Sequence, residues 1–111
     1  MFGSQVPAVT ATEVDQDAHL LDVREQDEWD VGHAPGAQHL PMSEIQARLD
    51  EVPTDRDVVV VCRSGNRSAR VVQFLLANGW RQVHNLDGGM QDWAAVGRPL
   101  VADHGQSAAV L

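Results

Sequence analysis

Short apolar runs alternate along the chain with segments whose apolar residues recur at helical spacing. Four segments are predicted to be strands, at residues 20–23, 37–40, 58–61 and 82–86, and the first is typical of a buried strand. The clearest run is Val58–Val61, because four consecutive β-branched residues suit a strand that is covered on both faces.

The strongest helical pattern begins at Ser68 and is followed by Asn78-Gly79, a good C-terminal stop. Its apolar stripe consists of Val71, Val72, Leu75 and Leu76. Weaker helical segments are predicted at residues 43–49 with Ser43 as N-cap, at residues 27–31 before Gly32, and around Trp93. Strands that alternate with helices predict an α/β fold, with a mostly parallel sheet and helices on both faces.

The length of 111 residues suits one domain, and 43% hydrophobic with 22% charged residues is ordinary globular usage. The two ends, residues 1–5 and 102–111, have little to bury, so we expect them to be flexible. No apolar stretch is long enough for a secretory signal or a membrane span. The sequence therefore predicts a soluble cytoplasmic protein that does not insert into membranes.

The formal net charge of −8 argues against a general affinity for nucleic acid or anionic lipid. All eight basic residues are Arg, and three of them, Arg63, Arg67 and Arg70, follow the single cysteine closely. One cysteine cannot form an internal disulfide, which fits a reducing compartment. The arginine cluster therefore predicts a local anion site, although Arg70 also fits a solvated helix face.

The segment after the clearest strand carries the candidate chemistry. It reads Cys62, Arg63, Ser64, Gly65, Asn66, Arg67 and Ser68. Gly65 and Asn66 are the residue types that most readily take positive φ, so successive N–H groups can turn inward as an anion nest at the start of a helix. Cys62 lies at the carboxyl end of a strand, where ligands collect in parallel sheets.

A cysteine in such a nest has a lowered pKa. At the ordinary value near 8.5, about 3% of a thiol is ionised at pH 7, whereas a drop of two units makes it roughly three-quarters thiolate. Arg63, Arg67 and the N–H donors together favour that drop. The alternative is that Cys62 is simply a small buried apolar residue, as free cysteines often are.

The loop resembles the active-site loop of the rhodanese family, a Cys followed by a basic residue, a Gly, an Arg and a Ser or Thr. Further segments similar to family landmarks are Leu21-Asp22-Val23-Arg24-Glu25, Gly32-His33-Ala34-Pro35-Gly36-Ala37, Gly88-Gly89-Met90-Gln91-Asp92-Trp93 and Gly97-Arg98-Pro99. Ala34 replaces the usual larger aliphatic residue. The resemblance spans residues 6–100 and implies one rhodanese-like domain with a five-stranded, mostly parallel sheet.

The resemblance also implies a mechanism without a cofactor or metal. The Cys62 thiolate attacks the outer sulfur of thiosulfate or a persulfide donor, and the resulting persulfide passes its sulfur to cyanide, a thiol or a carrier protein. The implied cradle comprises Arg63, Ser64, Gly65, Asn66, Arg67 and Ser68. Asp22 is expected to anchor the loop, and Arg24 to pair with Asp22, Glu25 or another carboxylate.

Two other functions remain open at this stage. Related phosphatases and arsenate reductases place five residues between Cys and Arg, whereas four separate Cys62 from Arg67. The smaller ring suits one sulfur atom better than a tetrahedral oxyanion. The second alternative is a non-catalytic module, either a sensor or a sulfur relay that docks on a partner protein. An intact loop argues against an inactive domain but not against a relay.

The histidines and tryptophans favour structural roles. The five histidines are scattered without a His-x-x-x-His pair, which argues against a metal site. His33 is expected to pack within its turn, although His33 or His84 near Cys62 would permit Cys/His hydrolysis. Trp29, Trp80 and Trp93 are predicted to be core or rim aromatics.

Overall fold

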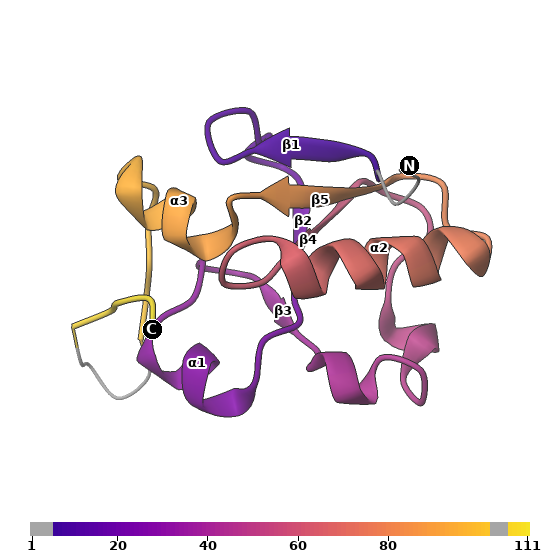
Figure 1. The fold of residues 1–111 in the computed structure, drawn as a ribbon, viewed down its shortest axis with the longest axis horizontal. Helices are drawn as coiled ribbons and strands as arrows, with labels where there is room; N and C mark the ends of the chain where they lie inside the picture. The colour runs from indigo at the N-terminus through magenta and orange to yellow at the C-terminus, as the bar shows by residue number, and fades with distance from the viewer. Residues whose placement is uncertain (1–5, 103–106) are drawn as a thin grey trace.

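The computed structural model describes residues 6–102 and 107–111. Five strands form one sheet, flanked by helices and turns (Figure 1). The elements are β1 (Ala8–Thr10), β2 (His19–Asp22), α1 (Gln26–Val31), β3 (Gln38–His39), η1 (Met42–Glu44), η2 (Leu49–Glu51), β4 (Val58–Val61), α2 (Asn66–Ala77), β5 (Val83–Asp87) and α3 (Gly89–Ala95).

The strand order is β1-β5-β4-β2-β3, and each neighbouring pair is parallel. β4 is therefore central, with β2 on one side and β5 on the other. Val61, the last residue of β4, lies opposite Asp22, the last residue of β2. The carboxyl ends of these two strands thus meet at one edge of the sheet, immediately before Cys62.

The sheet is covered on both faces, as the alternation of strands and helices predicts. Val58 and Val60 of β4 pack in one apolar cluster with α2, which contributes Val71, Val72 and Leu75. The intervening strand residues Val59 and Val61 pack in a second cluster with Met90 and Trp93 of α3. The predicted α/β class with helices on both faces is confirmed.

The predicted helix from Ser43 to Leu49 is wrong. Residues 42–51 instead form the two 3₁₀ turns η1 and η2, separated by non-helical backbone at Arg48 with φ −121° and ψ 28°. Pro41, and not Ser43, is the N-cap of the first turn, which has no side-chain capping hydrogen bond. Ile45 and Leu49 still reach the first apolar cluster, so packing against the sheet replaces helical continuity.

Two further boundaries differ from the sequence analysis. β1 was not predicted, because three residues at a sheet edge carry almost no periodic signal. The helix expected from Ser68 begins at Asn66, so Asn66 is helical and Gly65 alone of the two takes positive φ.

The C-terminal segment was expected to be flexible over residues 102–111. Residues 107–111 lie against the body of the protein, where the Ala109 N–H donates to the Val31 carbonyl at 3.1 Å. Val110 packs against the second apolar cluster. Residues 1–5 and 103–106 lie outside the described residues. Within the described chain, no helix is long and apolar enough to cross a bilayer.

Candidate active site

Cys62 follows β4 directly, and backbone hydrogen bonds from α3 orient the first peptide groups of its loop. The Met90 N–H donates to the Cys62 carbonyl at 2.8 Å, and the Gln91 N–H donates to the Arg63 carbonyl at 3.0 Å. These amides belong to the first turn of α3, where N–H groups lack partners within the helix. Because the carbonyls of Cys62 and Arg63 face α3, the following N–H groups are free to face the sulfur.

Gly65 makes the turn that brings its N–H to the thiol. It precedes α2 in a left-handed conformation with φ 107°, which a residue with a Cβ adopts only under strain. Its N–H donates to Cys62 Sγ at 3.1 Å. Its carbonyl accepts from Asn85 Nδ2 at 3.1 Å, so the peptide groups on both sides of the Gly65 Cα are held.

Ser68 supplies two more donors from the first turn of α2. Its N–H lies 3.4 Å and its Oγ 3.2 Å from Cys62 Sγ. Ser68 is fully buried, as is nearly all of Cys62, whose residue is only 1% exposed. The start of α2 therefore directs amides and a hydroxyl at one buried sulfur atom. This arrangement is the one expected of the anion nest that the sequence predicts.

The pKa of the Cys62 thiol is set by opposing effects. Burial raises it, because a thiolate loses hydration in the interior. The Ser68 hydroxyl and the amides of Ser68, Gly65 and Ser64 lower it, because they donate hydrogen bonds to the charged form. The net result is a pKa below the ordinary value for a thiol. The sequence predicts that Arg63, Arg67 and N–H donors lower this pKa together, and the neutral donors are the leading contributors.

The two loop arginines face other groups. Arg67 forms a bidentate ion pair with Glu28 of α1, with both N···O distances at 2.8 Å. The pairing raises the pKa of Arg67 and lowers that of Glu28. Arg63 is exposed, and its Nε donates to the Leu111 carbonyl. Arg67 thus braces the loop against α1, while Arg63 holds the C-terminal segment beside it.

Asp22 and Arg24 form an ion pair that is 0% exposed on both sides, at 2.7 Å. Arg24 also donates to the Gly32 carbonyl at 2.8 Å, and its own carbonyl accepts from His39. Of the partners predicted for Arg24, which were Asp22, Glu25 or another carboxylate, Asp22 is the one it pairs with. The pair ties the end of β2 to Gly32, directly after α1, and Glu28 of the same helix reaches Arg67.

The comparisons with known proteins agree with this geometry. The model of the rhodanese-like domain family matches residues 8–96. The chain belongs to this family. A sulfurtransferase of Allochromatium vinosum is 44% identical over 90 residues, which cover 81% of this chain and 84% of that protein. This rhodanese-like chain therefore has sulfur transfer as its general activity.

Solved structures show the same fold. A rhodanese-related protein from Thermoplasma volcanium superposes with a TM-score of 0.83 at 30% identity, covering 88% of this chain and all of that one. A thiosulfate sulfurtransferase from Pseudomonas aeruginosa superposes with a TM-score of 0.77, also at 30% identity. The match covers 95% of this chain but 21% of that protein, so this rhodanese-like domain corresponds to one part of the longer Pseudomonas aeruginosa chain.

Two residues of this rhodanese-like site were missed by the sequence analysis. Glu28 is the partner of Arg67, and Asn85 of β5 contacts both Ser68 and Gly65. An available signal for Asn85 was its place inside a predicted strand, where asparagine is uncommon. No comparable signal marks Glu28, because acidic residues near a helix start are ordinary.

The histidines have partners away from the sulfur. The His33 ring stacks on Trp29 with centroids 3.6 Å apart, and its Nδ1 contacts the Trp29 carbonyl at 2.9 Å. In the described part of the chain, no histidine is hydrogen-bonded to Cys62 Sγ. His33 therefore packs within its turn as predicted, and the arrangement needed for a Cys/His hydrolase is not formed there.

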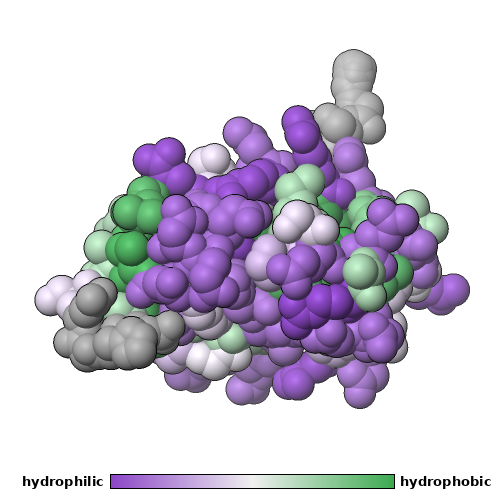
Figure 2. Space-filling view, turned by 90° about the horizontal axis from the view of Figure 1, so that it is seen from below, coloured by the Kyte–Doolittle hydropathy of each residue, from purple (hydrophilic) through white to green (hydrophobic). Residues whose placement is uncertain are grey.

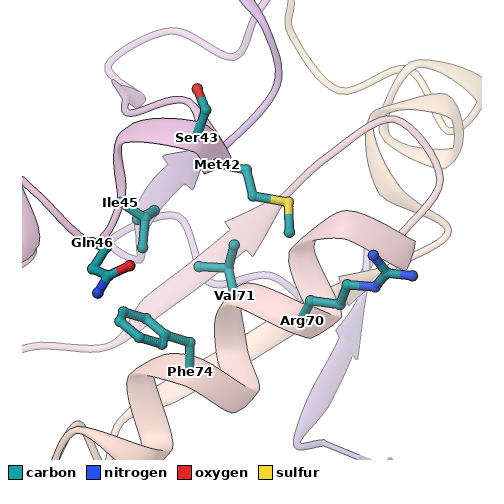
Figure 3. Close-up of a pocket in the computed structure, with 7 residues that line it drawn as sticks. All are labelled: Met42, Ser43, Ile45, Gln46, Arg70, Val71 and Phe74. Carbon is teal, nitrogen blue, oxygen red and sulfur yellow. The ribbon is translucent and has the colours of Figure 1, made fainter.

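A shallow groove of about 230 Å³ lies between η1 and α2. Its lining residues are Met42, Ser43, Ile45, Gln46, Arg70, Val71 and Phe74 (Figure 3). The face seen in Figure 2 is mostly hydrophilic, with hydrophobic atoms in separate areas. Arg70 lies at the rim of this groove and extends away from Phe74. Because Cys62 is not among the lining residues, the groove does not identify the reacting atom.

Proposed function

We propose that this protein transfers sulfane sulfur through a persulfide on Cys62. The observation that supports this proposal most directly is that the buried Cys62 sulfur accepts hydrogen bonds from the Gly65 amide and from the amide and hydroxyl of Ser68. Such donors stabilise an anionic sulfur without a general base. They suit the thiolate before transfer and the persulfide anion after it.

The reaction has two balanced half-reactions. The Cys62 thiolate attacks the outer sulfur of a donor such as thiosulfate, a new S–S bond forms, and sulfite departs with the electron pair of the broken bond. An acceptor then attacks the terminal sulfur, and Cys62 leaves as the thiolate again. Cyanide would be released as thiocyanate, and a thiol would become a persulfide. Cys62 is only 1% exposed, so neighbouring atoms must be displaced before each reactant reaches the sulfur.

The loop residues have complementary proposed roles. The backbone of residues 63–68, with Ser64 and Asn66 among them, forms the cradle for the terminal sulfur. Arg63, exposed at the loop, attracts an anionic donor, while Arg67 keeps the loop rigid through Glu28. Asp22 and Arg24 support the site from the neighbouring strand.

Thiosulfate is the proposed donor because the structurally similar Pseudomonas aeruginosa protein is named a thiosulfate sulfurtransferase. The acceptor is a small thiophile or the thiol of a carrier protein. A cytoplasmic location is proposed because a single free cysteine fits a reducing compartment.

Intact-mass measurement after mixing with thiosulfate tests the proposal. The expected product is the protein plus one sulfur atom, and added cyanide removes that atom. Cys62→Ser should gain no sulfur and lose turnover by about three orders of magnitude or more. Thiosulfate turnover by Cys62→Ser at the parent rate would refute the assignment.

The same preparation separates the alternatives. Hydrolysis of an aryl phosphate without sulfur loading would favour oxyanion chemistry. A loaded protein that reacts slowly with cyanide but rapidly with one protein thiol would select the relay function.

A further inference from the structure

Asn85 is a buried polar side chain on β5, only 3% exposed, beside the active-site loop. Its Nδ2 lies 3.1 Å from the Gly65 carbonyl and 3.0 Å from Asp87 Oδ1. Both neighbours are acceptors, so the amide nitrogen must face them, and the reversed orientation would oppose oxygen to oxygen. The other end of the amide, Oδ1, is thereby directed at Ser68.

The Ser68 hydroxyl has two acceptors but one proton. Its Oγ lies 2.5 Å from Asn85 Oδ1 and 3.2 Å from Cys62 Sγ. Neither Asn85 Oδ1 nor a thiolate carries a proton to donate. When the sulfur is anionic, both compete for the single Ser68 proton.

The protonation state of the sulfur decides this competition. A neutral thiol is a donor, so it donates to Ser68 Oγ while the hydroxyl donates to Asn85. An anionic sulfur is the stronger acceptor, because hydrogen bonds to charged groups are stronger than those between neutral groups. The hydroxyl then turns to the sulfur, and Asn85 Oδ1 loses this donor within a buried site.

We propose that Asn85 is a positioning residue that makes the Ser68 hydroxyl a two-position switch, turned to Asn85 when Cys62 is a thiol and to sulfur when it is a thiolate or persulfide. Asn85 thus acts through Ser68 without touching the reactants. It restrains thiolate formation through the hydroxyl, while its contact with the Gly65 carbonyl keeps the Gly65 amide on the sulfur. The inference rests on the proposed function and extends it, because it states which group accepts the Ser68 hydrogen bond in each state of Cys62.

A double-mutant cycle isolates the coupling between Asn85 and Ser68. The thiol ionisation constant is measured from the pH dependence of alkylation in the parent, Ser68→Ala, Asn85→Leu and the double variant. Without the competing acceptor, Ser68 donates to the thiolate unopposed, so Ser68→Ala should lower the ionisation constant roughly threefold more in the Asn85→Leu background than in the parent. Loss of the Gly65 contact is common to both Asn85→Leu proteins and cancels in the cycle.

Equal effects of Ser68→Ala in the two backgrounds, or a smaller effect in the Asn85→Leu background than in the parent, would overturn the proposal. Asn85→Ala provides a second cycle if Asn85→Leu does not fold. Asn78→Leu is the control, because Asn78 lies at the far end of α2 and donates to the Phe74 carbonyl; its substitution should leave the effect of Ser68→Ala unchanged.

Charged side chains of the active-site loop, and of the elements in contact with it, remain in every protein of the cycle. They are Asp22, Arg24, Glu28, Arg63, Arg67 and Asp87. Their contributions to the pH profile are therefore shared, and the difference between backgrounds reports the hydroxyl.

A measurement on the unmodified side chains provides a second test. The ¹³C signal of the Asn85 side-chain carbonyl should titrate with the same midpoint as Cys62 alkylation, because its hydrogen bond is released as the thiol ionises. The Asn78 carbonyl should stay constant, and the Asn85 change should disappear in Ser68→Ala. An Asn85 signal that is constant through the midpoint, or a change that persists without the hydroxyl, contradicts the switch. Sulfur loading is not needed for either experiment, so failure of the proposed function would show separately in the mass measurement.

Discussion

The ends of β2 and β4 are neighbours in the sheet, yet they bury charge in opposite ways. At the end of β2, Asp22 is fully buried against the guanidinium of Arg24. At the end of β4, Cys62 is nearly as buried, but amides and a hydroxyl surround its sulfur. One site holds a permanent charge with a counter-ion, and the other holds a variable charge with dipoles.

The difference follows from what each group must do. A fixed opposite charge binds a carboxylate tightly, but it would also resist any loss of charge at a reacting sulfur. Neutral donors stabilise a thiolate while still allowing it to become a neutral, bonded sulfur during transfer. The β2 end is therefore suited to support, and the β4 end to chemistry.

The largest expected effect is the loss of the buried pair. Asp22→Ala leaves the Arg24 charge uncompensated in the interior and should reduce the free energy of unfolding by about 3–5 kcal/mol. Urea denaturation measures the change. Asp22→Ala combined with Arg24→Met should recover much of the loss, because the isolated charge is gone. A single variant as stable as the parent would show that the β2 end is not a structural anchor.

Gly65→Ala should have the next largest effect. A Cβ at φ 107° costs about 1–2 kcal/mol of stability, and relaxation of the strain moves the Gly65 amide away from Cys62. Gly79→Ala is the matched control, because Gly79 has φ 101° with open space around it and lies at the other end of α2. Thermal unfolding should show a loss in both variants, and a larger one in Gly65→Ala, where the added Cβ would also lie 3.3 Å from the Leu86 carbonyl oxygen. Slower sulfur loading is expected only in Gly65→Ala. Equal loading rates would mean that the Gly65 amide is dispensable.

Ser68→Ala should raise the pKa of the Cys62 thiol, because the hydroxyl is the leading stabiliser of the thiolate. The pKa of the Cys62 thiol is lower in the folded than in the unfolded protein. The sulfur of the folded protein is therefore ionised above the folded pKa and becomes protonated as the pH falls through it. The midpoint of alkylation against pH should therefore move upward, because the thiol ionisation constant falls roughly tenfold. Ser68→Thr, which keeps a hydroxyl, should retain the parent midpoint more closely. An unchanged alkylation midpoint in Ser68→Ala would mean that backbone amides alone stabilise the thiolate.

The smallest expected effect concerns Arg67. Arg67→Ala removes a positive charge that interacts with Cys62 and exposes the carboxylate of Glu28, so it should raise the thiol pKa slightly. The pair is partly exposed, and its loss should reduce stability by less than about 1 kcal/mol. Adding Glu28→Gln to Arg67→Ala should return the alkylation midpoint towards the parent value. A shift as large as that of Ser68→Ala would restore the arginines as the main source of thiolate stability.

Much of the fold was predictable because it depends on local patterns. The valine run of β4 and the apolar stripe of α2 specify a buried strand and the helix that covers it. Residues 42–51 were harder, since Ile45 and Leu49 fit a helix and also fit two separate turns that pack on the sheet. The short edge strand β1 exists through its pairing with β5, a contact distant in sequence.

The sequence by itself determined the fold class and the local form of the nest, and it singled out Cys62 as the proposed nucleophile, because Cys62, Gly65 and Ser68 lie within one short segment whose residue types restrict its conformation. Only the tertiary structure decided which groups complete the site. Glu28 reaches Arg67 across 39 residues and Asn85 reaches Ser68 across 17, and both contacts arise from how α1 and β5 pack beside the loop. Local conformation is encoded by neighbouring residues, whereas the sharing of one hydroxyl proton between Cys62 and Asn85 depends on distances that folding alone establishes.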